Sequence, residues 1–105
     1  MVTQHLVRIF TQIKVMKMKD MKQMMAALEQ AGARVCGTTD EFYGEKNENN
    51  GIWVAADYTP SLFDYYSDKW GDTFGVQPKL NDMVENSGWY FEWYDPGTMM
   101  VWENF

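Results

Sequence analysis

The fold of this chain depends on a stretch near its end, residues 89–103, which reads WYFEWYDPGTMMVWE. Large apolar residues alternate with other residues on both sides of the central Asp95-Pro-Gly-Thr, and a period of two is typical of a half-buried β-strand. Asp, Pro and Gly are turn residues. We therefore predict a β-hairpin that folds back at this turn.

The register of this hairpin decides which aromatic side chains share a face. We expect Tyr94 to pair with Met99, because this register gathers the large apolar residues together. Since Pro96 cannot adopt the positive φ of the preferred two-residue turns, a longer loop and a shift by one residue stay open. In the expected register, one face holds Trp89, Phe91, Trp93, Met100 and Trp102, and the other holds Tyr90, Glu92, Tyr94, Val101 and Glu103.

Residues 34–57 also have the pattern of a hairpin. The segments Arg34-Val-Cys and Gly51-Ile-Trp-Val-Ala-Ala are candidate strands, separated by a long polar stretch. Asn50-Gly51 suits a turn with two positive φ angles. We therefore expect the turn at this dipeptide, with a clear strand after it and, before it, a long polar strand for which a partial loop stays open.

Three helices are expected. Residues 18–31 are strong helix formers with apolar residues at helical spacing, and Gly32 follows as a stop. A second helix is expected to begin at Thr59-Pro60 and to end at Gly71, and a third to span residues 78–87 before Gly88. Residues 1–16 are compatible with an earlier start of the first helix, with a strand or with a loose extension.

Together these elements predict an α+β fold: a small antiparallel sheet of two hairpins packed against one long and two short helices. The 105 residues suffice for a single domain, residues 1–105. No window is long and apolar enough for a membrane span, and no secretory signal is visible, so we expect an intracellular, cytoplasmic protein without membrane association.

The charge is uneven along the chain. The net charge is −6, but residues 1–31 carry +3 and residues 32–105 carry −9. An acidic domain repels phosphate backbones, so direct binding of nucleic acid is not expected.

The residues used in most catalytic and metal sites are scarce. Cys36 is the one cysteine and His5 the one histidine, so neither a Cys-His nor a Ser-His-Asp set is expected, and zinc ligands are lacking. No glycine-rich phosphate loop is present. We therefore predict a protein that is not an enzyme and that uses no cofactor or metal.

Two functional hypotheses follow. The first is an acidic protein-binding module that docks on a basic protein surface. In a narrower form it would be an inhibitor that mimics nucleic acid, in the manner of short acidic proteins of mobile elements such as phages. This form depends on carboxylates one helical turn apart, because that distance, about 6 Å, is close to the spacing of phosphates along a nucleic-acid strand. Its candidate residues are Asp40, Glu41, Glu45, Glu48, Asp64, Asp68 and Asp72.

The second hypothesis is a small ligand-binding domain or enzyme with an aromatic pocket. Tyrosine and tryptophan can stack on flat ligands or hold cations, and Glu92 lies between two tyrosines in the sequence. It predicts a concave site around Tyr66, Tyr90, Glu92 and Tyr94.

Overall fold

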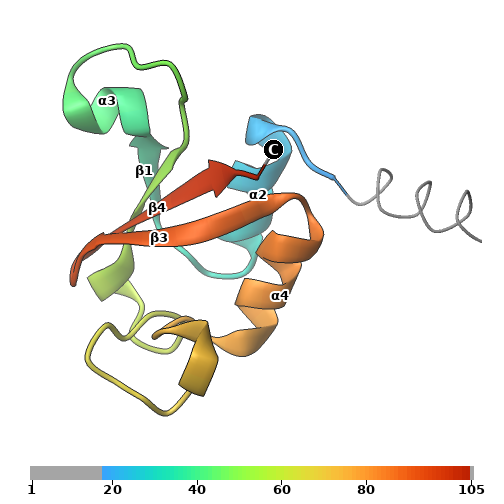
Figure 1. Cartoon of the computed structure of the whole chain (residues 1–105), viewed down its shortest axis with the longest axis vertical. Coiled ribbons are helices and arrows are strands. Elements are labelled where there is room, and N and C mark those ends of the chain that lie inside the picture. The colour runs from blue at the N-terminus through green and yellow to red at the C-terminus, as the bar shows by residue number, and fades with distance from the viewer. Residues whose placement is uncertain (1–17, 105) are drawn as a thin grey trace, which may run out of the picture.

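The computed structural model describes residues 18–104 of the chain (Figure 1), so the expectations for residues 1–16 concern positions outside this range. Its helices are α2 (Met21–Gln30), α3 (Thr39–Tyr43) and α4 (Pro78–Asn86), with 3-10 turns η1 (Ala56–Tyr58) and η2 (Gly71–Thr73). Its strands are β1 (Val35–Thr38), β2 (Ile52–Ala55), β3 (Trp89–Asp95) and β4 (Thr98–Glu103).

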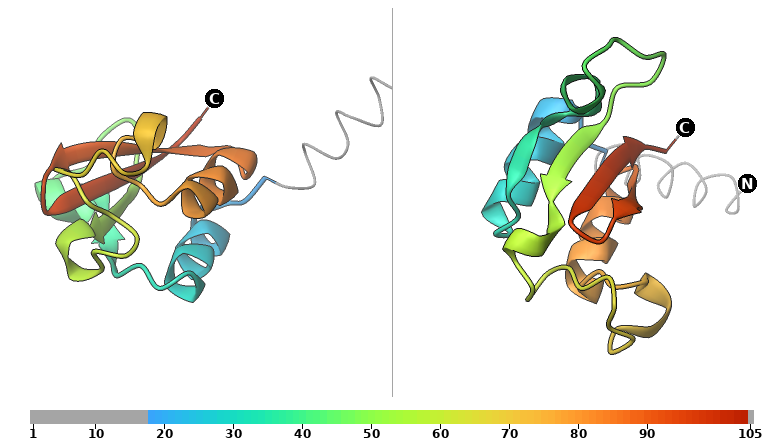
Figure 2. Two further views of the ribbon diagram at one scale, coloured as in Figure 1. Left: turned by 90° about the horizontal axis from the view of Figure 1, so that it is seen from below. Right: turned by 90° about the vertical axis from the view of Figure 1, so that its left-hand side faces the viewer.

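The four strands form one antiparallel sheet in the order β1-β2-β4-β3. Helices α2 and α4 lie on the same side of this sheet (Figure 2), and α3 lies at the end of β1. The predicted α+β fold, an antiparallel sheet with three helices, is confirmed, although α3 is not among the helices expected from the sequence. We call the face covered by α2 and α4 the inner face and the opposite one the outer face.

The first predicted helix is confirmed as α2, and its start is fixed by a capping box. The Asp20 carboxylate accepts a hydrogen bond from the Gln23 backbone N–H at 2.8 Å, and the Gln23 side chain accepts one from the Asp20 N–H at 2.9 Å. Gly32, with φ of +101°, follows the helix end, as expected for a carboxyl-terminal cap. The helix predicted over residues 78–87 is confirmed as α4.

The main core lies between the inner face and these two helices. Trp89 is the largest buried side chain, and its indole Nε1 donates to the carbonyl of Lys19 at 2.8 Å, which ties the start of α2 to β3. The burial of apolar side chains such as that of Trp89 is the main driving force of folding. The strands contribute Ile52, Val54, Met99 and Val101 to this core, and the helices contribute Met24, Leu28, Leu80 and Val84.

The predicted register of the carboxyl-terminal hairpin is wrong by one residue. Met99 pairs with Trp93 rather than with Tyr94, and a bulge at Tyr94 takes up the extra residue before Asp95 pairs with Thr98. A one-residue slip moves the side chains of one strand to the other face relative to its partner. Consequently Met100 and Trp102 lie on the outer face, away from Trp89.

The prediction of a turn at Asn50-Gly51 is also wrong, although β1 and β2 do pair. Helix α3 and a loop connect these strands, and the Asn50 side chain accepts a hydrogen bond from the Asp40 backbone N–H at 3.1 Å. Gly51 lacks a positive φ; a Cβ at this position would lie 2.6 Å from the Val101 carbonyl oxygen, so glycine permits close approach to β4.

The helix expected from Thr59 to Gly71 does not form. Residues 62–64 are instead paired with residues 75–77: Asp64 N–H donates to the Gly75 carbonyl at 2.7 Å, and Gln77 N–H donates to the Leu62 carbonyl at 2.8 Å. These long-range bonds, together with burial of Phe63, hold the segment as an irregular loop and override its local helix signals.

Candidate functional site

The outer face of the sheet carries a second cluster of large side chains. Trp53 of β2 pairs with Met100 of β4, and Tyr90 of β3 pairs with Trp102, so all four residues lie on this face. Met100 is only 1% exposed, although α2 and α4 lie on the other side of the sheet. The outer face is therefore covered near Met100.

Helix α3 supplies the other side chains of this outer cluster. The Phe42 ring packs edge-on against Trp53 at 5.0 Å, Tyr94 at 4.9 Å and Tyr43 at 5.1 Å between ring centroids. Such edge-to-face pairs contribute about 0.5–1.5 kcal/mol beyond burial alone. The helix is in place because Thr38 and Glu41 form a capping box at its start.

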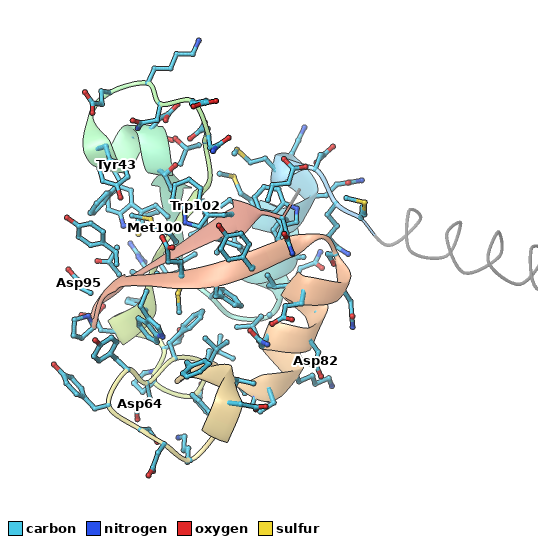
Figure 3. All side chains as sticks on the ribbon, in the orientation of Figure 1. Tyr43, Asp64, Asp82, Asp95, Met100 and Trp102 are labelled. Carbon is cyan, nitrogen blue, oxygen red and sulfur yellow. The ribbon has the colours of Figure 1, made fainter. Side chains whose placement is uncertain are left out.

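A groove of about 910 Å³ lies beside this cluster, between the loop after α3 and the outer face of β3 and β4. Figure 3 labels Tyr43 and Trp102, both of which line it. Three carboxylates, three aromatic rings and four asparagines line it, and among the described residues no lysine or arginine does so. The lining residues are Tyr43, Asn47, Glu48, Asn49, Asn50, Tyr90, Glu92, Trp102, Glu103 and Asn104.

One carboxylate of the groove is held in place. The indole Nε1 of Trp102 donates a hydrogen bond to Glu92 Oε1 at 3.2 Å, from the neighbouring strand. Glu92 is exposed, so the rest of its carboxylate is accessible to a ligand. A fixed carboxylate beside two aromatic rings can bind a cation through charge-assisted hydrogen bonds and through the ring faces.

Four of the predicted acidic residues lie in α3 or in the loop after it, and their environments differ. Asp40 Oδ1 accepts hydrogen bonds from the backbone and side chain of Asn47, and Glu41 Oε1 accepts from Thr38, so both carboxylates stabilise local structure. Glu45 is exposed on the loop, and Glu48 lines the groove.

The other three acidic residues lie elsewhere. Asp64, Asp68 and Asp72 belong to the long loop after β2, at the opposite end of the molecule from α3 (Figure 1). The structure therefore divides the seven predicted residues into two groups. Because no helix spans residues 59–70, Asp64 and Asp68 do not have the helical spacing that the sequence suggested.

The residues of the second hypothesis are partly brought together. Tyr90 and Glu92 both line the groove, and Tyr94 packs 4.9 Å from Phe42 in the adjoining cluster. Tyr66 lies on the long loop, 83% exposed and in edge-to-face contact with Tyr65. Sequence reasoning missed Tyr43 and Trp102, because the expected register placed Trp102 on the buried face.

Other chemistry is sparse in the part of the chain that the structure describes. Residues 18–104 contain no group of three or more His, Cys, Asp or Glu side chains that could hold a metal ion, and Cys36 is an exposed free thiol. No helix within this range has the length and apolar character needed to cross a membrane.

Comparison of the chain with protein-family models, with curated proteins and with solved structures finds no match.

Proposed function

We propose that this protein is a non-catalytic binding module whose outer-face groove receives a basic segment of a partner protein. The observation that carries the proposal is the lining of the groove: it includes Glu48, Glu92 and Glu103 together with Tyr43, Tyr90 and Trp102, and no described lysine or arginine. Opposite charge on a partner would complement these carboxylates.

Lysine and arginine fit such a groove for two reasons. Their charged ends can bind the carboxylates. A charged end placed over the face of a tyrosine or tryptophan ring would also strengthen the binding free energy by about 0.5–1 kcal/mol at an exposed site. The net charge of −6 would also attract a basic partner over a longer range, which makes association faster and sensitive to salt.

Inhibition of a nucleic-acid-binding protein by mimicry is a narrower form of this proposal. Its support is the net charge rather than a regular row of carboxylates, because Asp64 and Asp68 are not on a helix and Asp40 and Glu41 make local hydrogen bonds. A small organic cation is the alternative occupant of the same groove, since Tyr90 and Glu92 both line it.

The test is calorimetric titration with three synthetic octapeptides, of alternating glycine with lysine, arginine or glutamate. The variant carries Glu48→Gln, Glu92→Gln and Glu103→Gln; its matched control carries Glu29→Gln, Asp57→Asn and Asp82→Asn, all exposed and outside the groove lining. If each groove carboxylate contributes about 0.5 kcal/mol, the groove variant should bind a basic peptide about tenfold more weakly.

The control variant should keep most of the affinity, because it removes the same charge elsewhere. Equal weakening in both variants would show that only overall charge matters, and lack of binding by either basic peptide would refute the proposal. Binding of tetramethylammonium or argininamide as tightly as the peptides would favour the small-cation alternative.

A further inference from the structure

Phe74, on the long loop after β2, has an unfavourable backbone conformation and an exposed side chain. Its φ of 50° and ψ of 54° are left-handed, and it is the one non-glycine residue with positive φ in the described range. The side chain is 77% exposed. Bulky residues rarely adopt this conformation, because the Cβ crowds the following carbonyl.

The conformation belongs to a tight turn. The Val76 N–H donates to the Thr73 carbonyl at 3.2 Å, and both central residues, Phe74 and Gly75, have positive φ, as in a type I′ turn. Asparagine or glycine is the usual first central residue of such a turn. Little burial of the Phe74 ring is available to offset the strain.

The surrounding contacts hold this backbone in place. The Trp93 indole Nε1 donates to the Phe74 carbonyl at 2.7 Å, and Thr73 Oγ1 donates to the Val76 carbonyl at 2.6 Å. Asp64 N–H also bonds the Gly75 carbonyl at 2.7 Å. The ring is therefore presented to solvent from a fixed backbone, and strain of this kind is often kept where it has a function.

A small hollow of about 180 Å³ adjoins Phe74 and is acidic. Asp72 and Glu85 contribute carboxylates to its lining, and no described lysine or arginine lines it. Asn81 Nδ2 donates to Glu85 Oε1 at 2.8 Å, which orients that carboxylate. The hollow therefore complements one basic side chain.

We propose that Phe74 and this hollow form a second docking surface, which binds a protein whose apolar pocket receives the Phe74 ring and whose adjacent lysine or arginine enters the hollow. Aromatic residues presented in a fixed geometry contribute most of the affinity in many protein interfaces, because little entropy is lost on binding. Phe74, Asp72 and Glu85 do not line the groove, and Tyr90 is the one described residue that lines both surfaces.

The first test is urea unfolding of Phe74→Asn. Asparagine suits the turn, so the unfolding midpoint should rise above that of the unmodified protein. Phe74→Ala keeps the strain and removes the ring, so its midpoint should change little. A fall in the midpoint of both variants would show that the ring has a structural role and would overturn the proposal.

The second test is selection from a phage-displayed library of a small folded domain with randomised surface positions, because a folded domain can form an apolar pocket; counter-selection uses Phe74→Asn. The selected domains should combine apolar residues with lysine or arginine. They should bind at least tenfold more weakly to Phe74→Asn and to the double variant Asp72→Asn, Glu85→Gln, yet bind normally to the single variant Glu92→Gln in the groove.

If no selected domain distinguishes Phe74→Asn from the unmodified protein, the proposal is overturned. Concentration-dependent dimerisation that Phe74→Asn abolishes, seen by sedimentation, would identify a second copy of this chain as the occupant and would overturn the assignment to a different protein.

Discussion

Thr39 shows how one polar side chain organises the loop that forms a wall of the groove. It is fully buried, and its hydroxyl Oγ1 accepts a hydrogen bond from the Gly51 backbone N–H at 2.7 Å and lies 3.4 Å from Asn50 Oδ1. The start of α3 and the end of the loop before β2 are joined at this point. A buried hydroxyl with such partners stabilises the loop, because its partners would otherwise lack hydrogen bonds.

We predict that Thr39→Val destabilises the protein by about 1–3 kcal/mol, because it leaves the buried Gly51 N–H without an acceptor at nearly unchanged volume. Urea unfolding measures this free energy. Thr39→Ser is the matched control: it keeps the hydroxyl and should cost only about 0.8 kcal/mol for the lost methyl group. Equal stability of Thr39→Val and the unmodified protein would contradict the assigned role.

Trp102 marks the limit of residue-level prediction. Its aromatic character and its place in a strand were evident from the sequence. The face of the sheet on which its side chain lies depends on whether the strand contains a bulge beside the turn, and Tyr94 forms such a bulge. Since a single bulged residue exchanges faces, the hydrogen bond from Trp102 to Glu92, and with it the groove, could not be predicted from alternation alone.

At the scale of elements, α2 has all its start signals in its own sequence. Asp20 and Gln23 satisfy each other's backbone N–H groups, and this local motif does not depend on distant residues. The prediction used other local signals, namely the helix-forming residues, their apolar spacing and Gly32, and it placed the helix at residues 18–31 rather than Met21–Gln30. The segment after Thr59 also has a capping residue and a proline, yet distant pairing with residues 75–77 prevents the helix.

We predict that Asp20→Ala lowers the free energy of unfolding by about 1 kcal/mol, the usual cost of removing an N-cap side chain. Asp20→Asn should be nearly neutral, since asparagine caps as well as aspartate does. Thermal unfolding of the two variants provides the comparison. A loss as large in Asp20→Asn as in Asp20→Ala would mean that the charge of Asp20, rather than its hydrogen bond, matters.

At the scale of the whole molecule, both faces of the sheet are packed. The inner face carries the core beneath α2 and α4, whereas the outer face carries the aromatic cluster that covers Met100. An antiparallel sheet often leaves one face to solvent. Here α3 returns over that face and brings Phe42 and Tyr43 to it.

We predict that Met100→Ala destabilises the protein by about 2–5 kcal/mol, as much as Met99→Ala on the inner face, because both side chains are fully buried. Tyr66→Ala should change stability by no more than about 0.5 kcal/mol, since Tyr66 is exposed. Urea unfolding of the three variants tests the arrangement. A cost for Met100→Ala near that of Tyr66→Ala would show that the outer face is open to water.

The sequence by itself determined the α+β class, helices α2 and α4 and the carboxyl-terminal hairpin, because caps, turn residues and periodic apolar positions act over a few neighbouring residues. Only the tertiary structure decided the hairpin register, the loop in place of a helix after Thr59 and the groove that Tyr43 and Trp102 both line. These features depend on contacts between residues far apart in the chain, whose free energies exceed local preferences and leave no periodic pattern.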